Sequence, residues 1–222
     1  MTLHFVNLLE DLKRRAGRMA GLVADMVQEA CEAVIDTDES LARRVIRRDE
    51  EVDSEEVAVE SEVIRLMALY QPVGSDLRLL CAILKTNNDL ERIADCAVNI
   101  AERARHVDAE TIARYGNAVK EMELFVRRML RHAIQAFVVE DVDAARDTFA
   151  QDDPIDALYE QIIKQIVAEG AASSEGMAAR LDVLSVAKNL ERIADHATNV
   201  AEDVIFFSTG EIVRHVEGAE RP

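Results

Sequence analysis

Residues 90–102 read Leu90-Glu-Arg-Ile-Ala-Asp-Cys-Ala-Val-Asn-Ile-Ala-Glu102, and residues 190–202 read Leu190-Glu-Arg-Ile-Ala-Asp-His-Ala-Thr-Asn-Val-Ala-Glu202. Ten of the thirteen positions are identical, at an offset of 100 residues. Upstream the offset becomes 103, because residues 49–53 pair there with residues 152–156. A match that extends beyond one segment indicates that the chain is an internal duplication of one structural unit.

The rest of the chain has the pattern of long helices. Apolar residues recur at steps of three and four, which is the period of an amphipathic helix. Turn-forming residues such as Pro72, Gly74 and Gly170 fall in short breaks between these stretches. The pattern predicts six helices, over residues 3–35, 40–70, 76–105, 111–139, 143–168 and 175–207.

The predicted fold is all-α. Long helices joined by short loops pack as antiparallel neighbours, so the duplication predicts two tandem three-helix bundles related by a pseudo-twofold axis. The first unit would span residues 1–107. The second unit, with a short tail, would span residues 108–222.

Composition narrows the classes of function. Of the 222 residues 43 are acidic and 26 basic, which gives a net charge of −17. Such a chain is repelled by nucleic acid and by anionic lipid surfaces. The longest apolar run, Leu79–Leu84, is too short for membrane insertion, and the N-terminus lacks a signal-peptide pattern. Three cysteines without Cys-x-x-Cys spacing indicate a reducing compartment, so we expect a cytoplasmic protein.

The duplication also preserves polar residues, which a shared core does not require. The first acidic group has an aspartate pair on the second helix and three polar residues on one face of the third: Asp49, Asp53, Glu91, Asp95 and Asn99. The second acidic group repeats it: Asp152, Asp156, Glu191, Asp195 and Asn199. Glu102 and Glu202 continue the same faces. Like charges four residues apart repel each other, and oxygen-only donors suit magnesium, manganese, calcium or iron rather than tetrahedral zinc. We therefore predict that each group binds metal.

Other interpretations stay open from the residues alone. In a chain with 43 acids, such stripes also arise by chance as solvated faces. Arg92 and Arg192 fit salt bridges along a helix face. His196 stands where the first copy has Cys96, and both positions fit a buried side chain or a ligand. A purely structural bundle, or one whose acidic faces contact a basic partner, fits the pattern as well.

Enzymatic signatures are missing from the sequence. No histidine has a glutamate three residues before it, as a ferritin-like di-iron site requires. There is no glycine-rich phosphate loop and no Gly-x-Ser-x-Gly motif. The chain is therefore predicted not to be an enzyme. The alternative is a carboxylate-cluster metalloprotein, used for metal storage or for redox or hydrolytic chemistry.

The sequence resembles the PhoU family of phosphate-specific transport regulators. The resemblance is carried by both Leu-Glu-Arg-Ile-Ala-Asp segments and extends nearly end to end, through residues 19–23, 45–53, 71–72, 76–78, 202–211 and 213–215. It implies paired three-helix bundles, a homodimer, and polynuclear metal sites at the two acidic groups. The ions it implies are divalent or trivalent: iron, manganese, magnesium or zinc.

The resemblance also implies a role. Members of the family restrain the phosphate-starvation response when phosphate is plentiful. The partners implied are the sensor histidine kinase of the phosphate regulon and the ATPase subunit of the phosphate ABC transporter. The protein would thus be cytoplasmic, and peripheral to the inner membrane through these partners.

Two departures from the family pattern distinguish the copies. The family usually has histidine after the aspartate in both, whereas the first copy here has Cys96. The second copy lacks a counterpart of Gln71-Pro72. The two sites are therefore predicted to differ in affinity or in metal.

Overall fold

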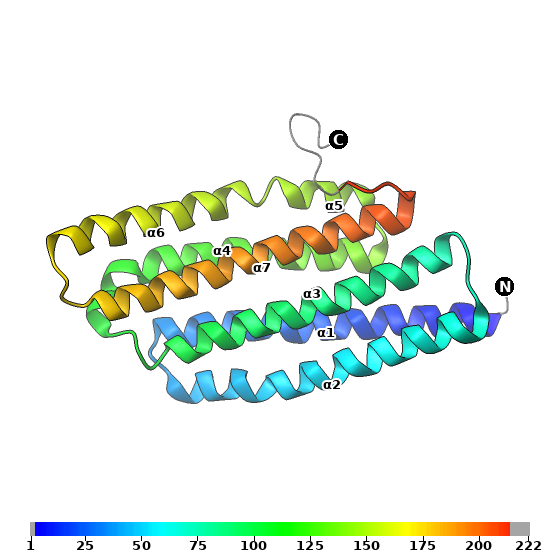
Figure 1. Ribbon diagram of the computed structural model, residues 1–222, viewed down its shortest axis with the longest axis horizontal. Coiled ribbons are helices and arrows are strands. Elements are labelled where there is room, and N and C mark those ends of the chain that lie inside the picture. The colour runs from blue at the N-terminus through cyan, green and yellow to red at the C-terminus, as the bar shows by residue number, and fades with distance from the viewer. Residues whose placement is uncertain (1–2, 214–222) are drawn as a thin grey trace.

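The computed structural model describes residues 3–213, and helices form nearly all of that range (Figure 1). Its helices are α1 (Leu3–Ile35), α2 (Glu39–Tyr70), α3 (Ser75–Arg103), α4 (Ala109–Val139), α5 (Val142–Phe149), α6 (Asp153–Ala172) and α7 (Met177–Thr209). The all-α prediction is confirmed, and the arrangement is consistent with two three-helix units. The loop between α3 and α4 contains the predicted boundary between the units.

Polar residues in the predicted breaks fix the helix ends. An aspartate side chain accepts hydrogen bonds from backbone N–H groups at the start of three helices: Asp38 for α2, Asp108 for α4 and Asp141 for α5. Such N-caps each contribute about 1 kcal/mol. At the other end of the chain, α7 stops at Gly210, whose φ of 85° is the left-handed conformation that glycine adopts without strain.

The fifth predicted helix is divided. One helix over residues 143–168 was predicted, and this is wrong at residues 150–152, where a turn separates α5 from α6. Pro154 gives the reason, since proline has no N–H and its ring clashes with the carbonyl four residues earlier. It is tolerated in the first turn of α6, where it lies. The equivalent helix of the first unit, α2, is continuous.

The two bundles lie side by side with their helices nearly parallel to one long axis (Figure 1). Their principal contact is between α3 and α7, which run antiparallel, and we call it the α3–α7 seam. Ion pairs hold it at both ends: Lys85 Nζ lies 3.3 Å from Asp203 Oδ1, and Arg103 Nη1 lies 3.3 Å from Asp182 Oδ1. In both pairs the N-terminal part of one helix contacts the C-terminal part of the other, as a pseudo-twofold relation between the units predicts.

Apolar side chains fill both bundles and the space between them. Four methionines at equivalent places on α1 and α4 are buried: Met19, Met26, Met122 and Met129. Cys31 and Cys96 are buried free thiols. Burial raises the pKa of Cys96 to about 11, which keeps that thiol protonated at neutral pH. Within residues 3–213, no helix is long and apolar enough to cross a bilayer.

Candidate functional site

The first acidic group joins α2 to α3. The carboxylates of Asp49 and Asp53 on α2 lie near that of Asp95 on α3. Burial, and then repulsion by those two aspartates, raises the pKa of Asp49. The pKa of Glu91 is raised by burial, and then by Asp95. These raised pKa values mean that the ionised carboxylates are disfavoured here, first by burial and then by their mutual repulsion. Four of the five predicted residues of this group thus lie near enough to interact electrostatically.

An arginine side chain pairs with two carboxylates of the first group. Arg92 Nε lies 3.1 Å from Glu91 Oε2, and its Nη1 donates to Asp95 Oδ2 at 3.0 Å. This is the helix-face salt bridge that the sequence suggested. All three side chains are partly exposed, so the pairs contribute little stability.

The second acidic group joins α6 to α7. Burial, and then Glu191, raises the pKa of Asp156, and the same two causes raise that of Asp195. Lys188 Nζ donates to Glu191 Oε2 at 2.5 Å, and its position in the first unit is occupied by an asparagine. Asp152 stands in the turn before α6, one helical turn from Asp156. The two groups therefore differ in the basic side chain that pairs with their carboxylates, Arg92 in the first and Lys188 in the second. They also differ at Cys96 and His196.

The two predicted asparagines lie differently. Asn199 Nδ2 donates to Asp89 Oδ1 at 3.1 Å, and His196 Nδ1 lies 2.8 Å from the same oxygen. Both side chains are thus directed across the α3–α7 seam to Asp89, which is only 6% exposed. Asn99 makes its hydrogen bond through the backbone, where its carbonyl oxygen accepts from Arg103 Nε.

Asp89 was missed by the sequence analysis. Asp89 is not among the repeated polar residues, because the second copy has Asn189 at the equivalent position. Its charge at a core position of α3 was the available signal, since buried carboxylates need a partner.

Neither acidic group is arranged as a finished metal site. Within residues 3–213, no three His, Cys, Asp or Glu side chains lie close enough together to hold an ion. The donor set nevertheless fits a hard cation, because it consists of carboxylates that repel each other. Binding an ion in the first group requires Glu91 and Asp95 to exchange Arg92 for the metal. In the second group Glu191 must release Lys188.

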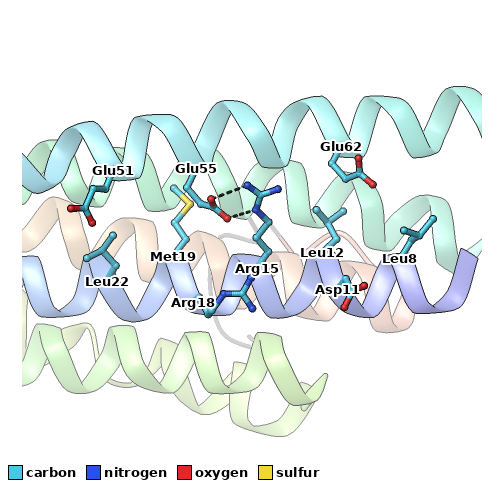
Figure 2. Close-up of a pocket in the computed structure, with 10 residues that line it drawn as sticks. All are labelled: Leu8, Asp11, Leu12, Arg15, Arg18, Met19, Leu22, Glu51, Glu55 and Glu62. Atoms are coloured by element: carbon cyan, nitrogen blue, oxygen red, sulfur yellow. Dashed lines mark hydrogen bonds and ion pairs between the residues drawn. The ribbon is translucent and has the colours of Figure 1, made fainter.

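A hollow of about 660 Å³ lies on the other side of α2, between α2 and α1 (Figure 2). Figure 2 shows Arg15 of α1 directed at Glu55 of α2, and Arg15 Nη2 donates to Glu55 Oε2 at 2.9 Å. The hydrogen bond from Arg15 lowers the pKa of Glu55. Because this carboxylate is already neutralised, the hollow is a weaker candidate for a cation than the acidic groups are.

The duplication is also found by comparison with known proteins. A family model described as the PhoU domain matches residues 16–104 and again residues 119–204. The chain belongs to the PhoU family. Each matched stretch contains one unit of the PhoU fold, the first within α1–α3 and the second within α4–α7. The resemblance inferred from the repeated segments is confirmed.

Individual PhoU proteins match over nearly the whole chain. The "Phosphate-specific transport system accessory protein PhoU homolog" of Pseudomonas aeruginosa is 34% identical over 209 residues, which cover 94% of this chain and 86% of the relative. The "PhoU homolog 1" of Thermotoga maritima is 35% identical over 222 residues, covering 96% and 94%. These names describe accessory proteins of a transport system, not enzymes.

Solved PhoU structures have the same fold. The crystal structure of PhoU from Pseudomonas aeruginosa superposes with a TM-score of 0.87 at 32% identity, covering 93% of this chain and all of that one. The phosphate transport system regulatory protein PhoU from Streptococcus pneumoniae gives a TM-score of 0.87 at 26% identity, covering 94% and 98%.

Proposed function

We propose that the protein is a non-enzymatic regulator of phosphate homeostasis. It restrains phosphate uptake and phosphate-starvation signalling when phosphate is plentiful. The observation that carries this proposal is the PhoU domain, matched in both units, in a chain whose relatives are named as accessory proteins of phosphate-specific transport. It acts by contact with the sensor histidine kinase of the phosphate regulon and the ATPase subunit of the phosphate ABC transporter.

Both proposed partners belong to membrane systems. The protein works on the cytoplasmic side of the inner membrane, held there by these contacts, and as a homodimer. A regulator of this kind needs a rigid surface more than a reactive centre. Long helices packed in two bundles provide such a surface.

The acidic groups supply metal sites in this proposal. The first would use Asp49, Asp53, Glu91 and Asp95, and the second Asp152, Asp156, Glu191 and Asp195. Burial, and then repulsion between carboxylates, raises the pKa values of Asp49 and Asp195, and a bound cation would neutralise that repulsion. It would tie α2 to α3 and α6 to α7, and so fix the outer surface that the partners meet.

A clean deletion tests the regulatory role. In phosphate-replete cells, loss of the gene should raise the output of a phosphate-regulon reporter, and the wild-type gene should restore repression. Glu91→Ala with Asp95→Ala, introduced into the complementing copy, should restore it less well if the first group supports partner contact. Unchanged reporter output in the deletion strain would contradict the proposal.

Elemental analysis tests the metal sites separately. Tag-free protein purified without chelator should contain iron, manganese, magnesium or zinc, and Asp95→Ala with Asp195→Ala should lose it. Circular dichroism of the double variant should show unchanged helicity. Equal metal content in both proteins would place the ion elsewhere, and absence of metal from both would leave the acidic groups as contact surfaces.

A further inference from the structure

The outer side of α4 carries two exposed arginines and a histidine on one stripe, with no acidic side chain among them. We call it the α4 basic face, and it consists of Arg128, Arg131, His132, Gln135 and the neighbouring Gln151. The four α4 residues follow helical steps of three, four and seven, so they share one stripe. Together the five side chains line an open hollow of about 480 Å³.

The same stripe has the opposite charge in the first unit. Helices α1 and α4 correspond at an offset of 103, as the buried pairs Met19 and Met122, and Met26 and Met129, show. At that offset, the positions of Arg128, Arg131, His132 and Gln135 are occupied on α1 by Asp25, Gln28, Glu29 and Glu32. Because the cores match, packing does not account for this reversal.

In the first unit the neighbouring helix forms ion pairs with one acid of the stripe, whereas within residues 3–213 no ion pair is formed with the basic residues of the stripe in the second unit. Glu29 of α1 is held by two arginines of α2, since Arg44 Nε and Arg48 Nη1 each lie 3.1 Å from its Oε2. At the same offset of 103, the second unit has Asp147 and Gln151. Gln151 Nε2 lies 2.8 Å from His132 Nδ1, which is a contact between neutral groups when the imidazole is uncharged.

The two arginines of the face make no direct salt bridge in the described part of the chain, although the charge of Arg131 acts on the carboxyl of Glu123 and opposes the rise of its pKa that burial causes. Within residues 3–213, neither Arg128 nor Arg131 forms an ion pair, although acids outnumber bases by 43 to 26 in the chain. Arg128 instead lies over the Phe125 ring, with its Cζ 5.0 Å from the ring centroid. By contrast, the next arginine along the helix, Arg127, is 2.9 Å from Glu123. The guanidinium groups of Arg128 and Arg131 therefore remain available to an external anion.

We propose that the α4 basic face docks an acidic segment of a partner protein. Arginine pairs with carboxylate through two parallel hydrogen bonds, and the side-chain amides of Gln135 and Gln151 add further donors. The net charge of −17 repels such a segment from the rest of the surface, so this face also sets the orientation of the partner. The inference deepens the proposed function by giving the chemistry of one contact, and its failure would leave the regulatory role untouched.

Fluorescence anisotropy with a labelled oligoglutamate peptide at low salt tests the proposal on the full chain. Arg128→Glu with Arg131→Glu should weaken binding at least about tenfold, since two charge-assisted pairs are lost. The matched control is Arg43→Glu with Arg47→Glu, which changes the net charge equally on exposed positions of α2. The control should bind within about twofold of wild type. Should the glutamate variant not fold, the glutamine variants of the same two arginines replace it.

Four outcomes would overturn the proposal. Equal weakening in both double variants would mean that only net charge matters, and unchanged binding would mean that the peptide lies elsewhere. Displacement of the peptide by low concentrations of inorganic phosphate would make the face a site for a small oxyanion. Self-association that is lost in Arg128→Glu with Arg131→Glu, without any peptide binding, would assign the face to a second copy of the chain.

Discussion

Replacing Asp49 by asparagine should stabilise the metal-free protein. The pKa of Asp49 is raised by burial and by repulsion from Asp53 and Asp95, so its negative charge opposes folding at neutral pH. Asparagine keeps the shape and removes the charge. One like-charge contact along a helix costs about 0.3 kcal/mol, and a second one across two helices a similar amount. The expected gain is about 0.6 kcal/mol, or about 2 °C in Tm for a chain of this length.

The same substitution should reverse its effect when metal is added. An ion that binds only the folded state contributes about 2.7 kcal/mol when its free concentration is about 100 times Kd. Asp49→Asn removes a charged ligand, so the variant should gain much less. Thermal unfolding followed by circular dichroism, with and without manganese, measures both the stability of the metal-free protein and the gain in stability from the metal. Glu50→Gln is the matched control, because Glu50 is an exposed neighbour outside the group.

Two results would refute this reasoning. A loss of stability in metal-free Asp49→Asn would mean that the carboxylate makes a favourable contact that repulsion does not outweigh. An equal gain from manganese in Asp49→Asn, Glu50→Gln and wild type would mean that Asp49 is not a ligand.

Substitutions at three further positions test an ion pair, the seam and the core packing. Glu55→Gln should cost about 0.5 kcal/mol of stability at neutral pH, because the ion pair with Arg15 is partly exposed. Since Arg15 lowers the pKa of Glu55, this stability is present above the ordinary glutamate pKa of about 4.3 and is lost as pH falls through the lowered value. The urea unfolding midpoints of variant and wild type should therefore converge in acid. Asp89→Ala should cost about 2 kcal/mol in urea unfolding, because it leaves His196 without its partner at a buried site, and Asp89→Asn should cost less. Ile193→Ala, at a fully buried position of α7, should cost about 3 kcal/mol, and a cost below that of an exposed valine-to-alanine change would contradict the assigned packing.

Features that depend on local periodicity were predictable from the sequence. Apolar residues on α1 and α4 recur at helical spacing because each helix buries one stripe. The breaks between the helices coincide with aspartate caps such as Asp38 and Asp108. The duplicated segment at residues 90–102 and 190–202 located both acidic groups, because it preserved charge where a core needs none. The helix-face salt bridge that Arg92 fits by sequence is local to one helix turn, and the structure has it with Glu91 and Asp95.

Features that depend on contact between the units were not predictable in this way. The Asp89 partners lie more than 100 residues away on α7, and no local pattern relates them. Asn199 fits a ligand by its helix face, yet its side chain bonds across the seam. Pro154 was a local signal for the break between α5 and α6, and the strong apolar period on both sides of it concealed the turn.

The contacts that the two units make at the α3–α7 seam are different, so each unit is complementary to the other unit rather than to a second copy of itself. If the first unit paired with its own copy along this seam, Asp89 would meet Cys96 and Asn99 in place of His196 and Asn199. In a pair of second units, no aspartate would be present at that position, since Asn189 stands there. Only the mixed pair joins a carboxylate to an imidazole. This contact therefore favours pairing of a first unit with a second unit over pairing of either unit with its own copy.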